Sequence, residues 1–238
     1  MKGIILAGGT GSRLHPLTKV TNKHLLPVGN EPMIFHAIHK MVEAQIEDIL
    51  VVTGVEHVGS IVGALGSGKD FNCHLTYRVQ DEAGGIAQAL GLARNFVGSE
   101  RMLVLLGDNI FQDSLLEVTQ RFQNQQMGAR VLLKTVEHPE RFGVPVFENG
   151  KIIRIEEKPE KPASQEAITG IYLYDAQVFD FIDELQPSWR NELEITDVNN
   201  HYLQLGQLAY DYLTGWWTDA GTFDSLYHAN HLIRLSTS

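Results

Sequence analysis

A glycine-rich segment near the N-terminus carries the residue types that bind phosphate groups. Gly8-Gly9-Thr10-Gly11-Ser12-Arg13 follows a short apolar run. Glycines in such a place let the backbone approach a phosphate chain and present several N–H donors to it. Arg13 adds a planar cation suited to paired hydrogen bonds with phosphate, and Lys23 supplies a second cation shortly afterwards. The pattern indicates a phosphate-binding loop, with a flexible surface turn as the weaker alternative.

Two other nucleotide-binding motifs are excluded by single residues. The dinucleotide fingerprint needs a third glycine where this chain has Leu14, and Glu31 precedes a predicted helix instead of ending a strand. Residues 63–69 match the spacing of a P-loop, but Asp70 stands where Ser or Thr would hold Mg²⁺. That segment also follows a predicted helix, and its glycines are interpreted as a helix C-terminus. The sequence therefore does not predict a nicotinamide dehydrogenase or a P-loop enzyme.

Two aspartates have positions suited to a divalent cation. Asp108, in Gly107-Asp108-Asn109, comes just past an apolar run, where a carboxylate can hold Mg²⁺ at the floor of a cleft. Asp219 lies in Thr218-Asp219-Ala220-Gly221. Each has a plain structural alternative, a turn residue for Asp108 and the N-cap of the last helix for Asp219. Together they favour a metal site, because transfer from a triphosphate requires neutralisation of its charge.

Further segments carry groups suited to a sugar or a base. Glu157 could accept hydrogen bonds from sugar hydroxyls and Lys158 could pair with a phosphate, although a solvated charge run explains the same residues. Thr169-Gly170 offers backbone close to a ligand, or a β-bulge. Gln80 and Gly84-Gly85 could contact a base, or form an ordinary glycine-rich turn. On residue chemistry alone these alternatives stay open.

The elements that must position these motifs alternate between strands and helices in the first half of the chain. Apolar runs predict strands at residues 3–7, 48–52, 75–79 and 101–106. Helical spacing predicts helices at residues 32–45, 57–65, 86–96 and 115–125. The alternation predicts an α/β fold with a mostly parallel sheet and helices on both faces. Ligands of such sheets bind at the carboxyl ends of the strands, where the glycine-rich loop and Asp108 fall.

After about residue 129 the pattern changes to strands joined by turns. Strands are predicted at residues 130–136, 144–147, 151–157, 168–174 and 208–213, with a hairpin turn at Asn149-Gly150. Helical patterns return at residues 175–185, 192–205 and 222–235. Without a linker or a repeat, we predict a single domain over residues 1–238. Its nucleotide-binding half spans about residues 1–128, and its sugar-phosphate-binding half spans about residues 129–238.

The composition describes an acidic protein with a substantial core. The 238 residues are 43% hydrophobic, which suffices for a core without disulfides, and the single cysteine, Cys73, cannot form an internal disulfide. The formal net charge of −10 is opposite to the basic footprint of a nucleic-acid binder. No apolar stretch reaches the length of a membrane span, and the first apolar run is too short for a signal peptide. We therefore expect a cytoplasmic protein without nucleic-acid or membrane partners.

The motifs, taken in this order, resemble those of the sugar nucleotidyltransferases, and among them the thymidylyltransferases that act on glucose 1-phosphate. The resemblance runs through nearly the whole chain and includes Pro139-Glu140-Arg141-Phe142-Gly143-Val144 and Glu192-Leu193-Glu194-Ile195-Thr196-Asp197-Val198. It implies a Rossmann-like three-layer fold with a central mixed, mostly parallel sheet and a small β-rich sugar-binding part. It also implies transfer from dTTP to α-D-glucose 1-phosphate, giving dTDP-glucose and pyrophosphate as the first step of dTDP-rhamnose synthesis. The alternatives are another sugar-1-phosphate nucleotidyltransferase, such as a UTP-dependent one, and a non-catalytic nucleotide-sugar sensor.

The resemblance also implies roles for individual residues. The expected catalytic residues are Arg13, Lys23 and Asp108, and the expected ligands of Mg²⁺, the one expected cofactor, are Asp108 and Asp219. The expected nucleotide-binding residues are Leu6, Gly8, Gly9, Thr10, Gly11, Arg13, Lys23, Gln80, Gly85 and Asp108. The expected sugar-phosphate-binding residues are Asn109, Gly143, Glu157, Lys158, Thr169 and Gly170. The expected assembly is a homo-oligomer, either a tetramer or a dimer.

The sequence departs from the family pattern at two positions. His24 follows Lys23 where the thymidylyltransferases usually carry Gln, and Ala220 stands where Thr is common. Neither departure removes a charged group that the chemistry needs. Longer relatives also carry an extra helical tail that takes part in subunit contacts and feedback inhibition. We expect that regulation to be altered or absent in this chain.

Overall fold

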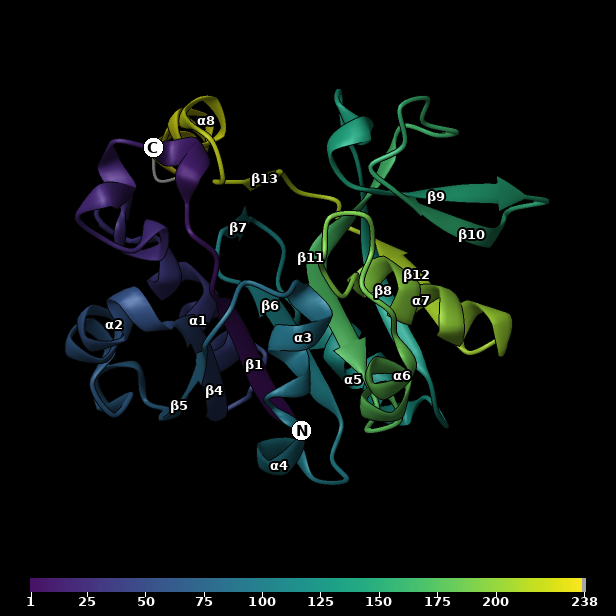
Figure 1. Ribbon diagram of the computed structural model, residues 1–238, viewed down its shortest axis with the longest axis horizontal. Coiled ribbons are helices and arrows are strands. Elements are labelled where there is room, and N and C mark those ends of the chain that lie inside the picture. The colour runs from purple at the N-terminus through teal and green to yellow at the C-terminus, as the bar shows by residue number, and fades with distance from the viewer. Residues whose placement is uncertain (237–238) are drawn as a thin grey trace.

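The fold is organised around parallel strands on either side of strand β1 (Figure 1). The computed structural model describes residues 1–236. β1 pairs with β4 on one side and with β6 on the other, and β5 pairs with the far side of β4. These strands are β1 (Lys2–Ala7), β4 (Asp48–Gly54), β5 (His74–Gln80) and β6 (Met102–Leu106). Because the strands are parallel, their carboxyl ends share one edge of the sheet, which is where a ligand is expected.

Strands from the second half of the chain extend the same sheet, mostly in the antiparallel sense. β11 pairs with β6 and so joins the two halves, while β8 and β9 pair with β11. β10 pairs with β9, and β12 runs parallel to β8. These strands are β8 (Ala129–Thr135), β9 (Gly143–Glu148), β10 (Lys151–Glu157), β11 (Glu166–Tyr174) and β12 (Leu208–Tyr212). The predicted α/β class with a mixed central sheet is confirmed.

Two short ribbons lie outside the large sheet. β2 (Pro27–Val28) pairs with β3 (Glu31–Pro32), and β7 (Asn109–Phe111) pairs with β13 (Trp217–Asp219). The sequence patterns do not predict the second ribbon, because strands this short show no period-two alternation. It brings the segment that follows β6 together with the segment that precedes the last helix.

Helices cover both faces of the sheet because successive side chains of a strand point to opposite sides. Ile4 and Leu6 pack with residues of α3, α4, α6 and α7, whereas Ile5 and Ala7 pack with residues of α1, α2 and α5. The helices are α1 (Met33–Glu43), α2 (Val58–Leu65), α3 (Ile86–Gly91), α4 (Arg94–Val97), α5 (Leu116–Asn124), α6 (Val178–Glu184), α7 (Ile195–Gln204) and α8 (Phe223–Ser236). Within residues 1–236, none of them is both long and apolar enough to cross a membrane.

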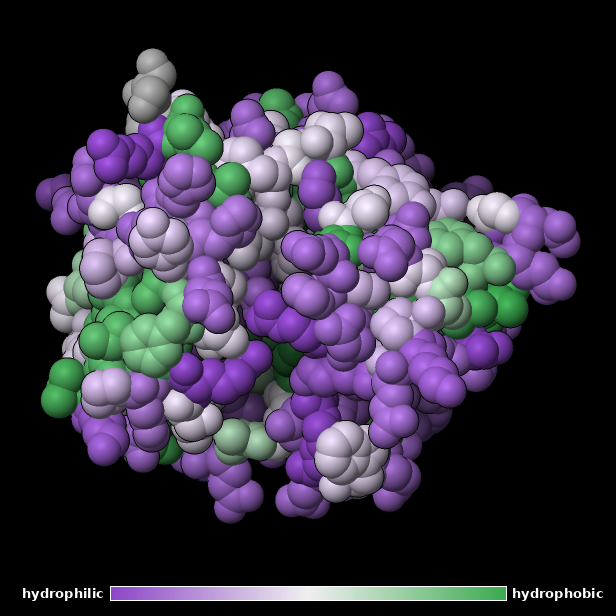
Figure 2. Space-filling view, turned by 90° about the horizontal axis from the view of Figure 1, so that it is seen from above, coloured by the Kyte–Doolittle hydropathy of each residue, from purple (hydrophilic) through white to green (hydrophobic). Residues whose placement is uncertain are grey.

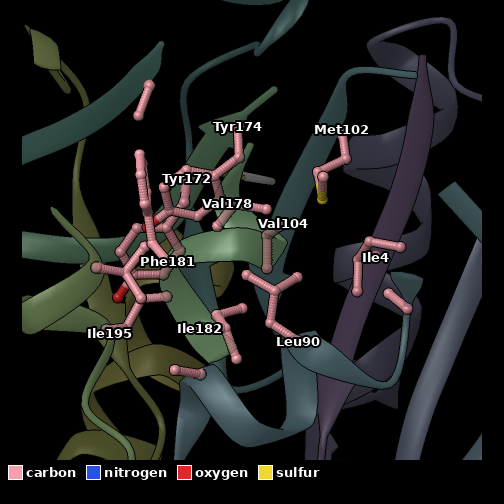
Figure 3. Close-up of a cluster of buried hydrophobic side chains, with 14 of the residues drawn as sticks. Ile4, Leu90, Met102, Val104, Tyr172, Tyr174, Val178, Phe181, Ile182 and Ile195 are labelled. Atoms are coloured by element: carbon pink, nitrogen blue, oxygen red, sulfur yellow. The ribbon is translucent and has the colours of Figure 1, made fainter. Parts of the chain in front are cut away.

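The cluster on the α3 side of the sheet holds the two largest fully buried side chains, Tyr174 and Tyr202. Figure 3 shows members of this cluster, contributed by strands and helices alike: Ile4, Leu90, Met102, Val104, Tyr172, Tyr174, Val178, Phe181, Ile182 and Ile195. Tyr174 is fully buried, and its hydroxyl donates to Asn199 Oδ1 at 2.6 Å. This hydrogen bond satisfies a polar group that would otherwise be costly to bury.

Two details differ from the sequence patterns. The helix predicted over residues 86–96 is interrupted after Gly91, where Ala93 N bonds Leu90 O in a tighter turn and α4 then begins. The last helix is capped by Thr222, whose hydroxyl accepts from Ser225 N at 3.2 Å. The alternative role of Asp219 as N-cap is therefore wrong, and its carboxylate is available for other contacts.

The packing around β1 predicts a large difference between two apolar truncations. Ile4 is fully buried, so Ile4→Ala should lower the free energy of unfolding by about 3 kcal/mol through lost burial and a residual cavity. Val20 is 85% exposed, and Val20→Ala should change it by less than about 0.5 kcal/mol. Urea denaturation monitored by circular dichroism measures both. Equal effects of the two substitutions would contradict the assignment of β1 to the core.

Candidate active site

A cavity of about 670 Å³ opens at the carboxyl ends of the parallel strands. Figure 2 looks down on this face and shows a hollow near its middle, bordered mainly by hydrophilic residues. Most of the residues expected from the sequence line this cavity: Leu6, Gly8, Gly9, Arg13, Lys23, Gln80, Gly85, Asp108, Asn109, Gly143, Glu157, Lys158, Gly170 and Asp219. Thr10 instead lines an adjoining hollow of about 140 Å³, and Gly11 and Thr169 line neither.

The glycine-rich loop follows β1 and is folded tightly against its neighbours. Gly11 has a φ of +62°, and a Cβ there would lie 2.9 Å from Thr18 Cγ2. The hydroxyl of Thr18 donates to Gly11 O at 2.7 Å and fixes the turn. Arg13 follows within the 3₁₀ turn η1 (Ser12–Leu14). Gly11 therefore shapes the loop, and Arg13 projects from that loop into the cavity.

Lys23 and Asp108 form an ion pair at the floor of the cavity. Lys23 Nζ lies 2.5 Å from Asp108 Oδ2, and the two side chains are only 14% and 13% exposed. Burial by itself raises the pKa of Asp108, but the Lys23 ammonium and the hydrogen bonds from Lys23 and Asn109 together outweigh burial and hold that pKa well below its usual range. Lys23 therefore faces a carboxylate that stays ionised throughout the physiological range.

Asp219 reaches the same place from the other end of the chain. In the β7–β13 ribbon Asp219 pairs with Asn109, and Ala220 N donates to Asp108 O at 2.8 Å. Burial and the charge of Asp108 raise the pKa of Asp219 to about 6, although Arg141 lowers it. The two carboxylates are thus close enough to repel each other, and a cation bound between them would relieve the repulsion.

His24 is fixed in one neutral form beside this pair. Asn22 Oδ1 accepts from His24 N at 2.9 Å and lies 2.7 Å from His24 Nδ1. Because an amide oxygen has no proton, Nδ1 must be the donor, and Nε2 is then an acceptor. Burial, with the charge of Lys23 next, lowers the pKa of His24 to about 3. The departure from Gln therefore places a neutral imidazole in the lining of the cavity.

Gln80 and the turn before α3 form one side of the cavity, where the sequence predicts contacts with a base. Gln80 Nε2 donates to Gln88 Oε1 at 2.7 Å, and a Cβ on Gly8 would lie 2.7 Å from Gln80 Oε1. Gly85 has a φ of +100°, and a Cβ there would lie 2.5 Å from Leu193 O. Glycine is therefore required at this turn by both its backbone angle and the close approach of the loop before α7.

Another side of the cavity, where the sequence predicts contacts with a sugar phosphate, begins at Asn109. Its Oδ1 accepts from Gly170 N and from Trp217 Nε1, both at 2.8 Å. A Cβ on Gly170 would lie 2.5 Å from Asn109 Nδ2, so only glycine at position 170 lets this strand lie so close to Asn109. Thr169 next to it is fully buried and donates its hydroxyl to Leu132 O at 2.9 Å. The structure thus brings Gly170 to the cavity and directs the Thr169 hydroxyl into the sheet.

Glu157 lies at the centre of a charged group on the same side. Its Oε2 accepts from Thr196 Oγ1 at 2.6 Å, and its Oε1 lies 3.4 Å from Arg190 and 3.6 Å from Lys158. Arg190 also donates through Nε and NH2 to the two oxygens of Glu194, at 3.1 and 2.6 Å. Cations and acceptors therefore alternate along this wall of the cavity.

Several lining residues are not found by sequence reasoning. Arg190 stands alone in a polar loop, and Thr196 lies on a predicted helix without any ligand-binding signal. Arg141 and Trp217 occur inside segments that carry the family resemblance, but their residue types suggest no role by themselves. For Trp217, the sequence signal that could have indicated a place in the site is its position next to Thr218-Asp219.

The buried imidazole predicts a specific pH dependence of stability. The pKa of His24 is lower in the folded protein than in the unfolded chain. The neutral ring's contribution to the free energy of unfolding is therefore fully present above pH 6.5 and is lost as the pH falls toward 3. Between pH 7.5 and pH 5, His24→Gln should lose about 2 kcal/mol less unfolding free energy than the parent protein. Urea denaturation at both pH values measures this difference. The control is His74→Gln, because the His74 side chain is 80% exposed. If His24→Gln showed the same pH dependence as the parent protein, the burial of a neutral His24 ring would be contradicted.

Comparison with known proteins gives a match along almost the entire chain. A family model described as nucleotidyl transferase matches residues 2–235. The glucose-1-phosphate thymidylyltransferase of Neisseria meningitidis is 43% identical, with 98% of this chain and 83% of that protein covered. A protein of the same name from Mycolicibacterium smegmatis is 40% identical, with 98% of this chain and 82% of that protein covered.

Solved structures give the same result. A crystal structure from Bacillus anthracis, provisionally named a glucose-1-phosphate thymidylyltransferase and bound to a sucrose, matches with a TM-score of 0.95 and 62% identity over 98% of this chain and 95% of that one. A UDP-glucose pyrophosphorylase complexed with UDP-glucose matches with a TM-score of 0.88 and 25% identity, over 99% of this chain and 98% of that one. From the family model, the relatives and the shared fold, we conclude that this chain belongs to the nucleotidyl transferase family.

Proposed function

We propose that this chain transfers a thymidylyl group from dTTP to glucose 1-phosphate, giving dTDP-glucose and pyrophosphate. One observation carries the proposal: the phosphate-binding cations, the paired aspartates and the Glu157 group all face one cavity of about 670 Å³. A cavity of this size accommodates a nucleotide and a sugar phosphate side by side. The curated relatives at about 40% identity carry the name of this reaction, which supports dTTP over UTP as the donor.

The reaction follows from what the two substrates bring. A phosphate oxygen of glucose 1-phosphate attacks the α-phosphorus of dTTP in line, and the bond from that phosphorus to the bridging oxygen of pyrophosphate breaks. The nucleophile is already an anion, so no strong general base is required. Catalysis then consists mainly of positioning and charge neutralisation. Arg13 and Lys23 are the groups that neutralise charge developing on the triphosphate, and they line the same part of the cavity.

Mg²⁺ is the cofactor that we propose, and the residues fit it. Asp108 and Asp219 supply two carboxylates that repel each other, and Mg²⁺ usually takes one or two carboxylates and completes its shell with water and phosphate. Within residues 1–236 no larger group of His, Cys, Asp and Glu side chains gathers in a form that could hold a metal, which favours an ion shared with substrate over a closed protein cage. When bound, the ion supplies neutralisation of the phosphate oxygens.

The remaining groups divide between the two substrates. Leu6, Gly8, Gln80 and Gly85 enclose the side of the cavity proposed for the thymine base. On the opposite wall Glu157 can accept hydrogen bonds from sugar hydroxyls, and Lys158 and Arg190 are the cations available to the sugar phosphate. The phosphates of both substrates then meet above Lys23 and the two aspartates.

The choice of nucleotide tests the proposal directly. Pyrophosphate release is measured with glucose 1-phosphate and each of dTTP, UTP, CTP and GTP. We expect the highest kcat/KM with dTTP. Binding of dTTP without any pyrophosphate release would identify a sensor instead of an enzyme, and a clear preference for GTP or CTP would overturn the thymidylyl assignment.

Removal of one carboxylate tests the metal assignment. Asp108→Asn keeps the shape of the side chain but removes its charge, so Mg²⁺-dependent turnover should fall by about a hundredfold or more. Circular dichroism should show an intact fold. Asp70→Asn, at an exposed position away from the cavity, is the matched control and should keep full activity. Near-parental activity of Asp108→Asn would show that this residue is not a metal ligand.

A further inference from the structure

Protein donors already contact the oxygens of both proposed metal ligands. Arg141 NH2 lies 3.3 Å from Asp219 Oδ1 and 3.2 Å from Asp219 Oδ2. Asp108 Oδ2 contacts Lys23 at 2.5 Å, and Asp108 Oδ1 accepts from Asn109 at 3.1 Å. A divalent cation that approaches Asp108 and Asp219 therefore finds Lys23 and Arg141 already in contact with their carboxylates.

Packing determines the position of Arg141 independently of its ion pair. Arg141 ends the 3₁₀ turn η6 (Pro139–Arg141), and Phe142 N donates to Pro139 O at 3.0 Å. The Phe142 ring packs edge-on against Trp217 with centroids 5.3 Å apart, and the Arg141 guanidinium lies 5.4 Å from the Phe142 centroid. Trp217 belongs to the same short strand as Asp219. The aromatic contact thus brings the guanidinium next to the carboxylate.

The two partners differ in exposure, and this decides how the pair behaves. The Asp219 side chain is only 16% exposed, so water has little access to its carboxylate. The Arg141 side chain is 36% exposed and, like Asp219, lines the cavity. An ion pair with one partly exposed member is weak enough to be exchanged. A triphosphate in the cavity would offer the guanidinium oxygens that carry more charge than one carboxylate.

We propose that Arg141 competes with the divalent cation for Asp219. Metal alone then binds weakly, because it must displace the guanidinium or lie beside it. Metal together with a triphosphate binds well, because the phosphates provide Arg141 with another anionic partner. Arg141 is therefore a positioning residue that couples metal binding to nucleotide binding. This inference rests on the proposed function, since it assumes that Asp219 is a metal ligand and that a triphosphate occupies the cavity.

The test measures metal binding without catalysis. Mn²⁺ replaces Mg²⁺ because free Mn²⁺ is quantified directly by electron paramagnetic resonance. Arg141→Gln removes the charge, Arg141→Met is a second neutral variant, and Arg141→Lys retains the charge. We expect both neutral variants to bind Mn²⁺ alone roughly three- to tenfold more tightly than the parent protein, with Arg141→Lys within about twofold of the parent. The surface control Arg121→Gln, at a side chain that is 50% exposed, should behave as the parent does.

A second site of substitution locates the effect. In a protein that already carries Asp219→Asn, the further substitution Arg141→Gln should give no gain in Mn²⁺ affinity. With dTTP present, the gain should disappear, and in steady-state assays Arg141→Gln should raise the KM for dTTP more than it lowers kcat. Equal Mn²⁺ affinity in the parent and the neutral variants, or a gain that persists with Asp219→Asn, would overturn the inference. Failure of the proposed function is distinguishable, because it appears as absent pyrophosphate release while the Mn²⁺ comparison remains measurable.

Discussion

The contact between Lys23 and Asp108 is the interaction on which the site depends. It joins the segment after the glycine-rich loop to the end of β6, and both side chains are largely removed from solvent. Removing one partner of a buried pair leaves the other charge uncompensated, which lowers stability. The pair therefore fixes the distance between the phosphate-binding loop and the carboxylate. Beside it, the neutral ring of His24 bonds Asn22 and the amide of Asn109 donates to Asp108, so neither side chain adds charge.

The distribution of charge explains how an acidic chain can bind two anionic substrates. The formal net charge is −10, yet cations gather on the walls of one cavity. Within residues 1–236, all of these cations except Arg13 form an ion pair with a nearby carboxylate, as Arg190 does with Glu194 and Arg141 does with Asp219. Because the carboxylates hold the cations in place, the wall is ordered without a large positive field. Ligand binding can then proceed by exchange of partners.

The sequence is sufficient to predict the fold class and a set of site residues most of which line the cavity, because these depend on local patterns. Continuous apolar runs identify β1, β4 and β6, and glycines mark the loops that end them. It is not sufficient for the β7–β13 ribbon, since three-residue strands such as Trp217–Asp219 leave no periodic signal. The site role of Arg190 was missed for a related reason, because it arises from tertiary contacts with Glu157 and Glu194. At Thr169 the side-chain hydroxyl bonds Leu132 O, so the predicted ligand contact of Thr169-Gly170 rests on the backbone alone.

The β7–β13 ribbon has a consequence for the order in which the protein matures. Trp217 and Asn109, which share a hydrogen bond across it, are 108 residues apart in the chain. Contacts between residues so far apart in the sequence form late, because closing the intervening loop costs conformational entropy before any stabilising contact is made. During synthesis the N-terminal strands emerge first and can begin to fold without the second aspartate. A ribosome-bound chain can therefore form the glycine-rich loop well before Asp219 joins Asp108. The proposed metal site is complete only when nearly the whole sheet is in place.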